Sequence, residues 1–162
     1  MASVVEILPS AHIFVGADWR SKKRVFEQAG VAFENASGVP RDQFFSALMQ
    51  RERLGSTCIG EDGAIPHGRL EGAGGPLCAL ALLKNPIQYG IGDGDGGAVR
   101  TLFFLIAPAG DETHLELLGM FAAMLSDAAL IEGLHNCADG DSARALLARW
   151  EAARGRENAA DG

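Results

Sequence analysis

Residues 77–107, LCALALLKNPIQYGIGDGDGGAVRTLFFLIA, contain two continuous apolar runs. The first is LCALALL at 77–83, and the second is VRTLFFLIA at 99–107, which Pro108 ends. A strand that is covered on both faces of a sheet has such a continuous run, whereas a half-exposed strand alternates between apolar and polar residues. We therefore expect two buried strands here, joined by the loop 90–97.

The sequence before these strands predicts two helices. Ser21 is a suitable N-cap, and apolar residues recur at helical spacing over 22–35. Pro40 suits the first turn of a second helix, which we expect to end near Arg53 with Gly55 as its stop signal.

Shorter strands are expected on both sides of this helical pair. A strand over 12–15 precedes the pair. The glycine-rich stretch 55–75 follows it, and within that stretch 64–65 and 69–70 predict two short pieces of strand.

The last third of the chain is predicted to be helical. Thr113 and Glu116 have the spacing of a capping box, in which two side chains satisfy the first backbone donors of a helix. Asp127 is placed to cap a shorter helix that runs through Leu134.

A final helix is expected from Asp141 or Ser142 through Trp150. Residues 153–162 have no apolar face, so we expect them to be a disordered tail. The interleaving of strands and helices predicts an α/β sandwich, formed as a single domain over 1–152.

The overall composition is typical of a soluble globular protein, with 162 residues, 48% of them hydrophobic and 22% charged. The formal net charge of −7 argues against a nucleic acid partner, although a local basic group is present at Arg41, Arg51, Arg53 and Arg69. No apolar run approaches the roughly 18–20 residues of a membrane span, and the N-terminus lacks the features of a signal peptide. We expect a cytoplasmic protein without membrane insertion.

The three cysteines are Cys58, Cys78 and Cys137, and no CxxC pair is present. This spacing suggests neither a zinc knuckle nor a redox dithiol. Cys78 lies in an apolar run and is expected in the core. Cys58 lies in the glycine-rich stretch, where an inert, partly buried thiol is the favoured interpretation and a nucleophile is the alternative.

His67 is the leading candidate for chemistry, within EDGAIPHGRL at 61–70. Pro66 fixes its own backbone angle, and Gly68 allows another group to approach closely. A neutral imidazole is a competent nucleophile towards phosphorus or a carbonyl carbon. Nearby arginines disfavour its protonation and offer fork-shaped donors for phosphoryl oxygens.

His114 is the second candidate, because it lies at a predicted helix start, where unpaired N–H groups favour an anion. A metal ion bridging it to His67 is an alternative, but no third ligand is suggested. His12 and His135 are interpreted as structural or exposed. The loop 92–97, GDGDGG, does not open a helix and lacks the further calcium ligands, so we interpret it as a turn.

The string RERLGSTCIGEDGAIPHGRL at 51–70 resembles the fructose/mannitol-type enzyme IIA domain of the bacterial phosphotransferase system, in its nitrogen-regulatory branch. The resemblance extends over roughly residues 5–152. Further matching segments are SKKRVFEQ at 21–28, FFSALMQRERLGST at 44–57, LKNPIQY at 83–89 and THLELLGMFAAMLSD at 113–127.

The resemblance implies a mixed β-sheet flanked by helices on both faces. It also implies that His67 accepts a phosphoryl group on Nε2 from a phosphohistidine carrier protein, which enzyme I charges from phosphoenolpyruvate. Arg51, sixteen residues earlier, and His114 match the residues that stabilise the phosphoryl group. No cofactor and no metal is implied.

The function implied is a phosphocarrier that regulates target proteins according to its phosphorylation state, with targets in potassium homeostasis or nitrogen metabolism. One alternative is a sugar-transport component that passes phosphate to a IIB domain for a fructose- or mannitol-like sugar. Another is an interaction module without phosphotransfer, because the chain departs from the family at Gly63 and Cys58. Gly63 replaces an aliphatic residue and is expected to loosen the approach to the site.

Overall fold

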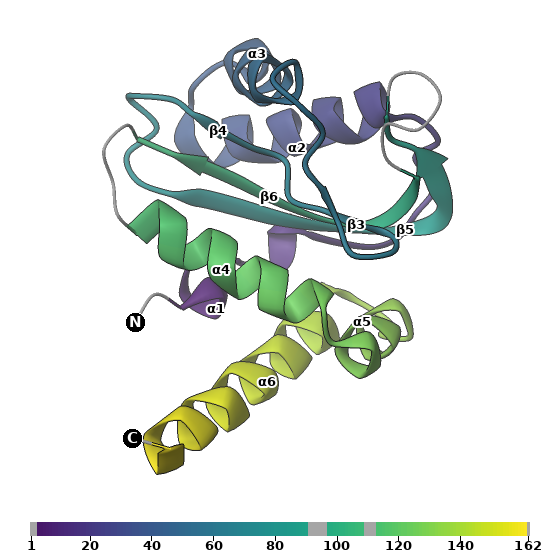
Figure 1. Ribbon diagram of the computed structural model, residues 1–162. Helices are drawn as coiled ribbons and strands as arrows, with labels where there is room; N and C mark the ends of the chain where they lie inside the picture. Colours follow the sequence, from purple (N-terminus) through teal and green to yellow (C-terminus); the bar gives the residue numbers. More distant parts are fainter. Residues whose placement is uncertain (1–2, 91–96, 109–112, 162) are drawn as a thin grey trace.

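The computed structural model describes residues 3–90, 97–108 and 113–161, and it shows a sheet between two layers of helices (Figure 1). The strands follow the order β1-β5-β6-β3-β2, and β4 also pairs with β6. Their bounds are β1 Ile13–Ala17, β2 Cys58–Ile59, β3 Gly63–Ala64, β4 His67–Arg69, β5 Leu77–Gln88 and β6 Ala98–Ala107. The predicted α/β fold, a mixed sheet flanked by helices on both faces, is confirmed.

The two apolar runs form β5 and β6, which pair antiparallel at the centre of the sheet. β1 runs parallel to β5, while β3 and β4 run parallel to β6. Alternate side chains of β5 enter two separate cores: Cys78, Leu80 and Leu82 on one face, and Ala79, Ala81 and Leu83 on the other. The run is continuous in sequence because both faces of the strand are buried.

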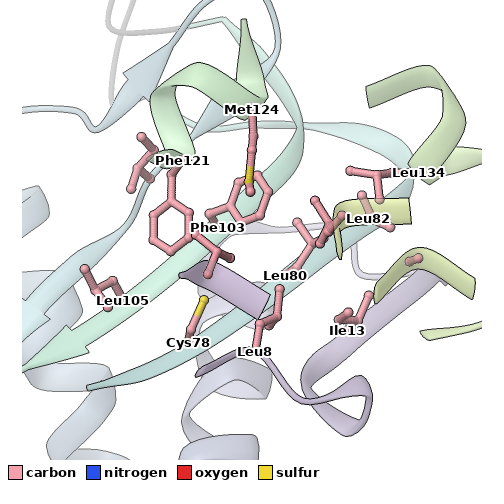
Figure 2. Packing of buried hydrophobic residues seen from close by; sticks show 14 of the residues in the cluster. Leu8, Ile13, Cys78, Leu80, Leu82, Phe103, Leu105, Phe121, Met124 and Leu134 are labelled. Carbon is pink, nitrogen blue, oxygen red and sulfur yellow. The ribbon is translucent and has the colours of Figure 1, made fainter. Parts of the chain in front are cut away.

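Each face of the sheet has its own helical layer (Figure 1). The helices on one face are α2 (Lys22–Ser37) and α3 (Arg41–Glu52). The other face is covered by α1 (Val4–Ile7), α4 (Thr113–Leu125), α5 (Ala128–His135) and α6 (Gly140–Asp161). Figure 2 shows the core beneath this second layer, where Phe103 of β6 stacks on Phe121 of α4 with ring centroids 4.8 Å apart.

The first two long helices begin where the sequence predicts. The Ser21 hydroxyl accepts a hydrogen bond from the Arg24 backbone N–H at 3.1 Å, so Ser21 is the N-cap of α2. Gly38 ends this helix in the left-handed region at φ 80°. α3 follows directly after Pro40 and ends at Glu52 with Arg53 as its C-cap, as predicted.

β5 is longer than predicted and continues from Leu83 to Gln88 through Pro86. The pairing with β6 changes register between Leu82 and Ile87, so Pro86 lies outside the paired positions. Proline lacks a backbone N–H and is tolerated in a strand at such an irregularity. The sequence pattern missed this extension because residues 84–86 are exposed and polar or proline.

The C-terminal helix differs from the prediction at both its start and its end. α6 begins at Gly140 rather than at Asp141 or Ser142, and the Asp139 carboxylate accepts from the Ser142 backbone N–H at 2.8 Å. The helix then continues to Asp161, so residues 153–161 are helical and not a disordered tail. This segment contains three alanines and two arginines, residues of high helix propensity that extend a helix that is already nucleated.

In the other predicted helices, α4 begins at Thr113 and α5 is capped by Asp127, whose carboxylate accepts from the Leu130 backbone N–H at 3.2 Å. Apart from Gly97, the loop 92–97 lies outside the described residues, so its interpretation as a turn stays a prediction.

Within the described ranges, no single helix is long and apolar enough to cross a membrane. α4 and α5 together meet that length and composition, but they are bent by 83° at their junction.

Candidate functional site

His67 is the first residue of β4 and pairs with Leu105 of β6. Its Nδ1 lies 2.8 Å from the backbone oxygen of Ile65. A carbonyl oxygen can only accept, so Nδ1 carries the proton in this bond. In the neutral ring, Nε2 is then the nitrogen with the free lone pair. The hydrogen bond therefore selects the tautomer in which the Nε2 lone pair is available.

The pKa of His67 is lowered from its ordinary value near 6.5, first by burial of the ring. The positive charges of Arg51 and Arg69 lower it further, while the hydrogen bond to Ile65 and the charge of Glu52 act in the opposite direction. The net effect keeps the imidazole neutral near pH 7, which is the form that can attack an electrophile.

An open cavity of about 430 Å³ contains both His67 and Arg51 in its wall. The rest of the wall comes from the β2 region, from the segment before β4 and from α4: Ser56, Thr57, Cys58, Ile59, Ile65, Leu118, Gly119 and Ala122. One nucleophilic ring and one guanidinium thus share a cavity whose other walls are uncharged. Such a cavity suits a small anionic group.

Arg51 lies in the last turn of α3, where a positive charge is favourable because of the helix dipole. Its Nη1 donates to the backbone oxygen of Gly55 at 2.8 Å. This bond uses one of the five N–H donors of the guanidinium and holds the group beside the turn that follows α3. Arg51 is therefore anchored on one side and borders the cavity.

His114 is the second residue of α4 and is 8% exposed. Its ring centroid lies 5.5 Å from that of His67, with the rings tilted by 58°. The two histidines are 47 positions apart in sequence and meet because α4 crosses the face of the sheet next to β4 (Figure 1). The structure thus brings together all three predicted site residues, with Arg51 in the shared cavity and His114 beside His67.

Glycine is required at Gly68 by the close packing of α3 on β4. A Cβ at this position would lie 2.9 Å from the backbone oxygen of Ala47. Contacts at that distance are not tolerated by backbone atoms on two fixed elements. The glycine after His67 therefore sets the distance between α3, which carries Arg51, and the strand that carries His67.

Gly63 does not loosen the site, contrary to the expectation from its departure from the family. It is buried, and a Cβ there would lie 2.8 Å from Cδ2 of Leu125. The Leu125 side chain from α4 occupies the space that an aliphatic residue would use. Cys58, the second departure, pairs with Ala64 in the β2–β3 ladder and is half-buried in the cavity wall.

The remaining candidate residues lie elsewhere. His12 is buried and bonds the backbone oxygen of Cys78 at 3.0 Å, which is a structural role. Arg41 pairs with Glu34 at 2.7 Å, so it does not join the basic group around His67. Across the described residues, no group of three or more histidine, cysteine or acidic side chains is arranged to hold a metal ion.

A buried polar cluster beneath the cavity was not anticipated from the sequence. Glu52, which is 8% exposed, accepts from the hydroxyls of Thr57 and Tyr89, and its other oxygen pairs with Lys22 at 2.9 Å. The signal available in the sequence was the position of Glu52, because a carboxylate in the last turn of a helix opposes the helix dipole. An acidic residue there needs a tertiary partner.

Comparison with known proteins identifies the class that this fold and site define. The sequence matches the family described as "Phosphoenolpyruvate-dependent sugar phosphotransferase system, EIIA 2" over residues 6–150. The chain belongs to this family, whose members are phosphoryl-transfer proteins.

Within the family, the chain is similar to nitrogen regulatory proteins. It is 39% identical over 130 residues to the nitrogen regulatory protein of Pseudomonas aeruginosa, which covers 79% of this chain and 83% of the relative. The crystal structure of nitrogen regulatory protein IIA-Ntr from Neisseria meningitidis matches with a TM-score of 0.80 and 36% identity, covering 89% of this chain and 98% of the other. A mannitol-specific enzyme IIA component of Staphylococcus aureus is 32% identical over 123 residues, covering 75% and 81%.

Proposed function

We propose that the protein is a phosphocarrier that accepts a phosphoryl group on Nε2 of His67. The donor is a phosphohistidine carrier protein, which enzyme I charges from phosphoenolpyruvate. The observation that carries this proposal is the hydrogen bond from Nδ1–H of His67 to Ile65, because it leaves the Nε2 lone pair available at a cavity shared with Arg51. The family relationship supports the same chemistry.

In the transfer step, the Nε2 lone pair of His67 attacks the phosphorus of the donor's phosphohistidine. The P–N bond to the donor breaks as the new P–N bond forms, and the donor imidazole retains that electron pair. His67 keeps its Nδ1 proton, and the Ile65 oxygen stabilises the positive charge that the ring gains. Arg51 and His114 bind the oxygens of the phosphoryl group and balance its charge.

The output is a change in protein binding around the cavity. Leu54 and Leu115 are large apolar side chains that are 83% and 71% exposed, and each lies close in sequence to a site residue. Such side chains are suited to transient contact with another protein. A phosphoryl group on His67 adds a charge of about −2, which favours one set of partners and disfavours another.

Regulation of target proteins is favoured over sugar uptake by the nitrogen regulatory relatives. By analogy, the targets belong to nitrogen or potassium regulation. The mannitol-specific relative supports the alternative, in which the phosphoryl group passes to a IIB domain. Incubation of the phosphorylated protein with purified IIB domains distinguishes the two, since only the sugar-transport function predicts rapid loss of the label to IIB.

The intact mass of the protein after incubation with phosphoenolpyruvate, an enzyme I and its phosphohistidine carrier tests the proposal. We expect one acid-labile phosphoryl group on the wild type and none on His67→Ala. His135→Gln is the matched control, because it replaces another half-buried histidine and should label normally. Labelling that persists in His67→Ala would contradict the assignment of the acceptor.

A further inference from the structure

The cluster beneath the cavity consists of Lys22, Glu52, Thr57 and Tyr89, which come from α2, the end of α3, the turn after it and the residue directly after β5. All three partners of Glu52 bond to its carboxylate. Thr57 and Tyr89 share Oε1, with the Tyr89 hydroxyl at 2.7 Å, and Lys22 Nζ lies 2.9 Å from Oε2. The side chain of Glu52 is 2% exposed, so its charge depends on these partners.

The hydroxyls of Thr57 and Tyr89 also lie 2.7 Å from each other. Burial raises the pKa of Tyr89, so its hydroxyl keeps its proton and can donate to the carboxylate. The ammonium of Lys22 lies 4.0 Å from the centroid of the Tyr89 ring, which adds a cation–π contact to the ion pair. Glu52 is therefore held by three partners, and Lys22 also contacts the Tyr89 ring, so the arrangement is rigid.

A short series of bonds connects this cluster to the nucleophile. The backbone oxygen of Thr57 accepts from the backbone N–H of Ile65 at 3.0 Å. The backbone oxygen of Ile65 in turn accepts from Nδ1–H of His67 at 2.8 Å. Movement of Thr57 therefore moves the acceptor that selects the tautomer of His67.

The same cluster holds the turn that positions Arg51. Arg51 and Glu52 are adjacent in α3, and the turn between Glu52 and Thr57 contains Gly55, whose oxygen accepts from Arg51 Nη1. The two ends of this turn are joined by the bond from Thr57 to Glu52. The carboxylate of Glu52 thus fixes a segment that contacts both the nucleophile and the guanidinium.

We propose that Glu52, held by Lys22 and Tyr89, is a positioning residue for phosphoryl transfer that acts on His67 through Thr57 and the backbone of Ile65. It touches neither the phosphoryl group nor the reacting nitrogen. Its role is to hold the Ile65 oxygen where it accepts from Nδ1, so that Nε2 stays unprotonated, and to hold the Gly55 oxygen that anchors Arg51. This inference rests on the proposed role of His67 as the acceptor.

The test uses the full chain with Thr57→Val, which has nearly the same shape but lacks the hydroxyl, and Thr57→Ser, which restores it. Nitrogen-15 NMR of the unphosphorylated protein measures which ring nitrogen of His67 carries the proton. We expect the Nδ1–H tautomer to dominate in the wild type and Thr57→Ser, and a mixture of tautomers in Thr57→Val. A wild-type tautomer distribution in a folded Thr57→Val would overturn the proposal.

A double variant, in which Lys22 and Glu52 are both replaced, addresses the carboxylate directly. Lys22→Met with Glu52→Gln removes the buried ion pair and keeps an acceptor for the hydroxyls, so its folding is less affected than that of Glu52→Gln alone. We expect the rate of transfer from saturating donor to fall roughly tenfold, as with other residues that orient a reacting group, with little change in KM for the donor. A fall through KM alone, or no fall, would contradict a positioning role.

The two readouts separate this inference from the proposed function. If the wild type accepts no phosphoryl group from an active donor, the proposed function fails, and the NMR comparison still decides whether Thr57 controls the tautomer. If the wild type is labelled on His67 but a folded Thr57→Val keeps the wild-type tautomer, or the Lys22→Met/Glu52→Gln variant transfers at the wild-type rate, the positioning role fails and the phosphocarrier function stands.

Discussion

His67 and His135 are both half-buried histidines whose pKa is lowered, but they differ in the charges of the neighbouring side chains. Burial is the main cause that lowers the pKa of each, and an arginine nearby lowers it further. The pKa of His135 falls to about 4. A neutral imidazole is therefore present in both places near pH 7, and protonation state alone does not distinguish them.

The atoms around each ring do distinguish them. His67 bonds a backbone oxygen through Nδ1 and shares its cavity with Arg51. His135 uses Nε2 to bond the Thr101 hydroxyl at 2.7 Å and borders a cavity of about 760 Å³. That second cavity contains one arginine but three carboxylates, those of Glu61, Asp62 and Glu132.

Under the proposed function, this difference in charge favours His67 over His135 as the phosphoryl acceptor. A transferred phosphoryl group spreads negative charge over its oxygens and needs cations or N–H donors around it. The His67 site offers a guanidinium and a second imidazole, whereas the carboxylates near His135 repel such a group. A lowered histidine pKa marks a buried ring, and only the neighbouring charges mark a phosphoryl site.

Removal of the Arg51 guanidinium should have the largest effect on the rate of phosphoryl transfer. We expect Arg51→Met to lower the rate of phosphoryl transfer to His67 by about 10²–10³-fold, the cost of losing one donor to a developing charge. Rapid-quench measurement with the phosphorylated donor gives the rate. Arg100→Met, beside His135, is the control and should leave the rate within about twofold. Equal losses in both variants would remove the distinction between the two sites.

A smaller effect, on the free energy of unfolding, is expected at the contact of Gly63 with Leu125. Gly63→Val should lower the free energy of unfolding by roughly 1–3 kcal/mol, because the new side chain overlaps Leu125. Denaturant unfolding measures the change. The double variant Gly63→Val with Leu125→Ala should recover part of the loss, and no recovery would mean that the strain arises elsewhere.

The second imidazole of the His67 site should contribute less than the guanidinium. We expect His114→Asn to slow phosphoryl transfer roughly tenfold without abolishing labelling, since it removes one of several groups that bind the phosphoryl oxygens. The same rapid-quench assay checks this. His12→Asn, at a histidine with a structural contact to Cys78, should not slow transfer in molecules that remain folded.

The pH dependence of stability compares the two histidines directly. The pKa of His135 is about 4 in the folded protein and near 6.5 in the unfolded chain. Between these values the unfolded chain binds a proton that the folded protein does not, so the free energy of unfolding falls as the pH is lowered from about 6.5 towards 4. Above pH 6.5 His135 is neutral in both the folded and the unfolded chain, so it no longer lowers the free energy of unfolding.

Denaturant unfolding between pH 7.5 and pH 5 tests this. We expect His135→Gln, which can still bond Thr101, to flatten the fall in stability, because it removes the group whose pKa falls to about 4; His67→Gln should act in the same direction. An equal slope in His135→Gln and the wild type would show that the folded protein protonates His135 at an ordinary pH.

Much of the fold could be predicted because the decisive signals are local. The continuous runs of β5 and β6, the N-caps Ser21 and Asp127, and the glycine after α2 each act over a few residues. The predictions were wrong at Pro86 and in the last turns of α6 for the opposite reason. β5 tolerates Pro86 because its pairing with β6 changes register there. α6 continues past Trp150 because helix propensity extends a nucleated helix even without an apolar face.

The sequence alone determined the two-sided burial of the central strands and the restricted backbone at Pro66 just before His67, because side-chain period and backbone restriction are properties of neighbouring residues. The tertiary structure decided the rest of the site. It set His114 beside His67, filled the space at Gly63 with Leu125, and joined Glu52 to Lys22 and Tyr89. These contacts join residues 30 to 62 positions apart, and they form only when the order of the strands brings distant elements together.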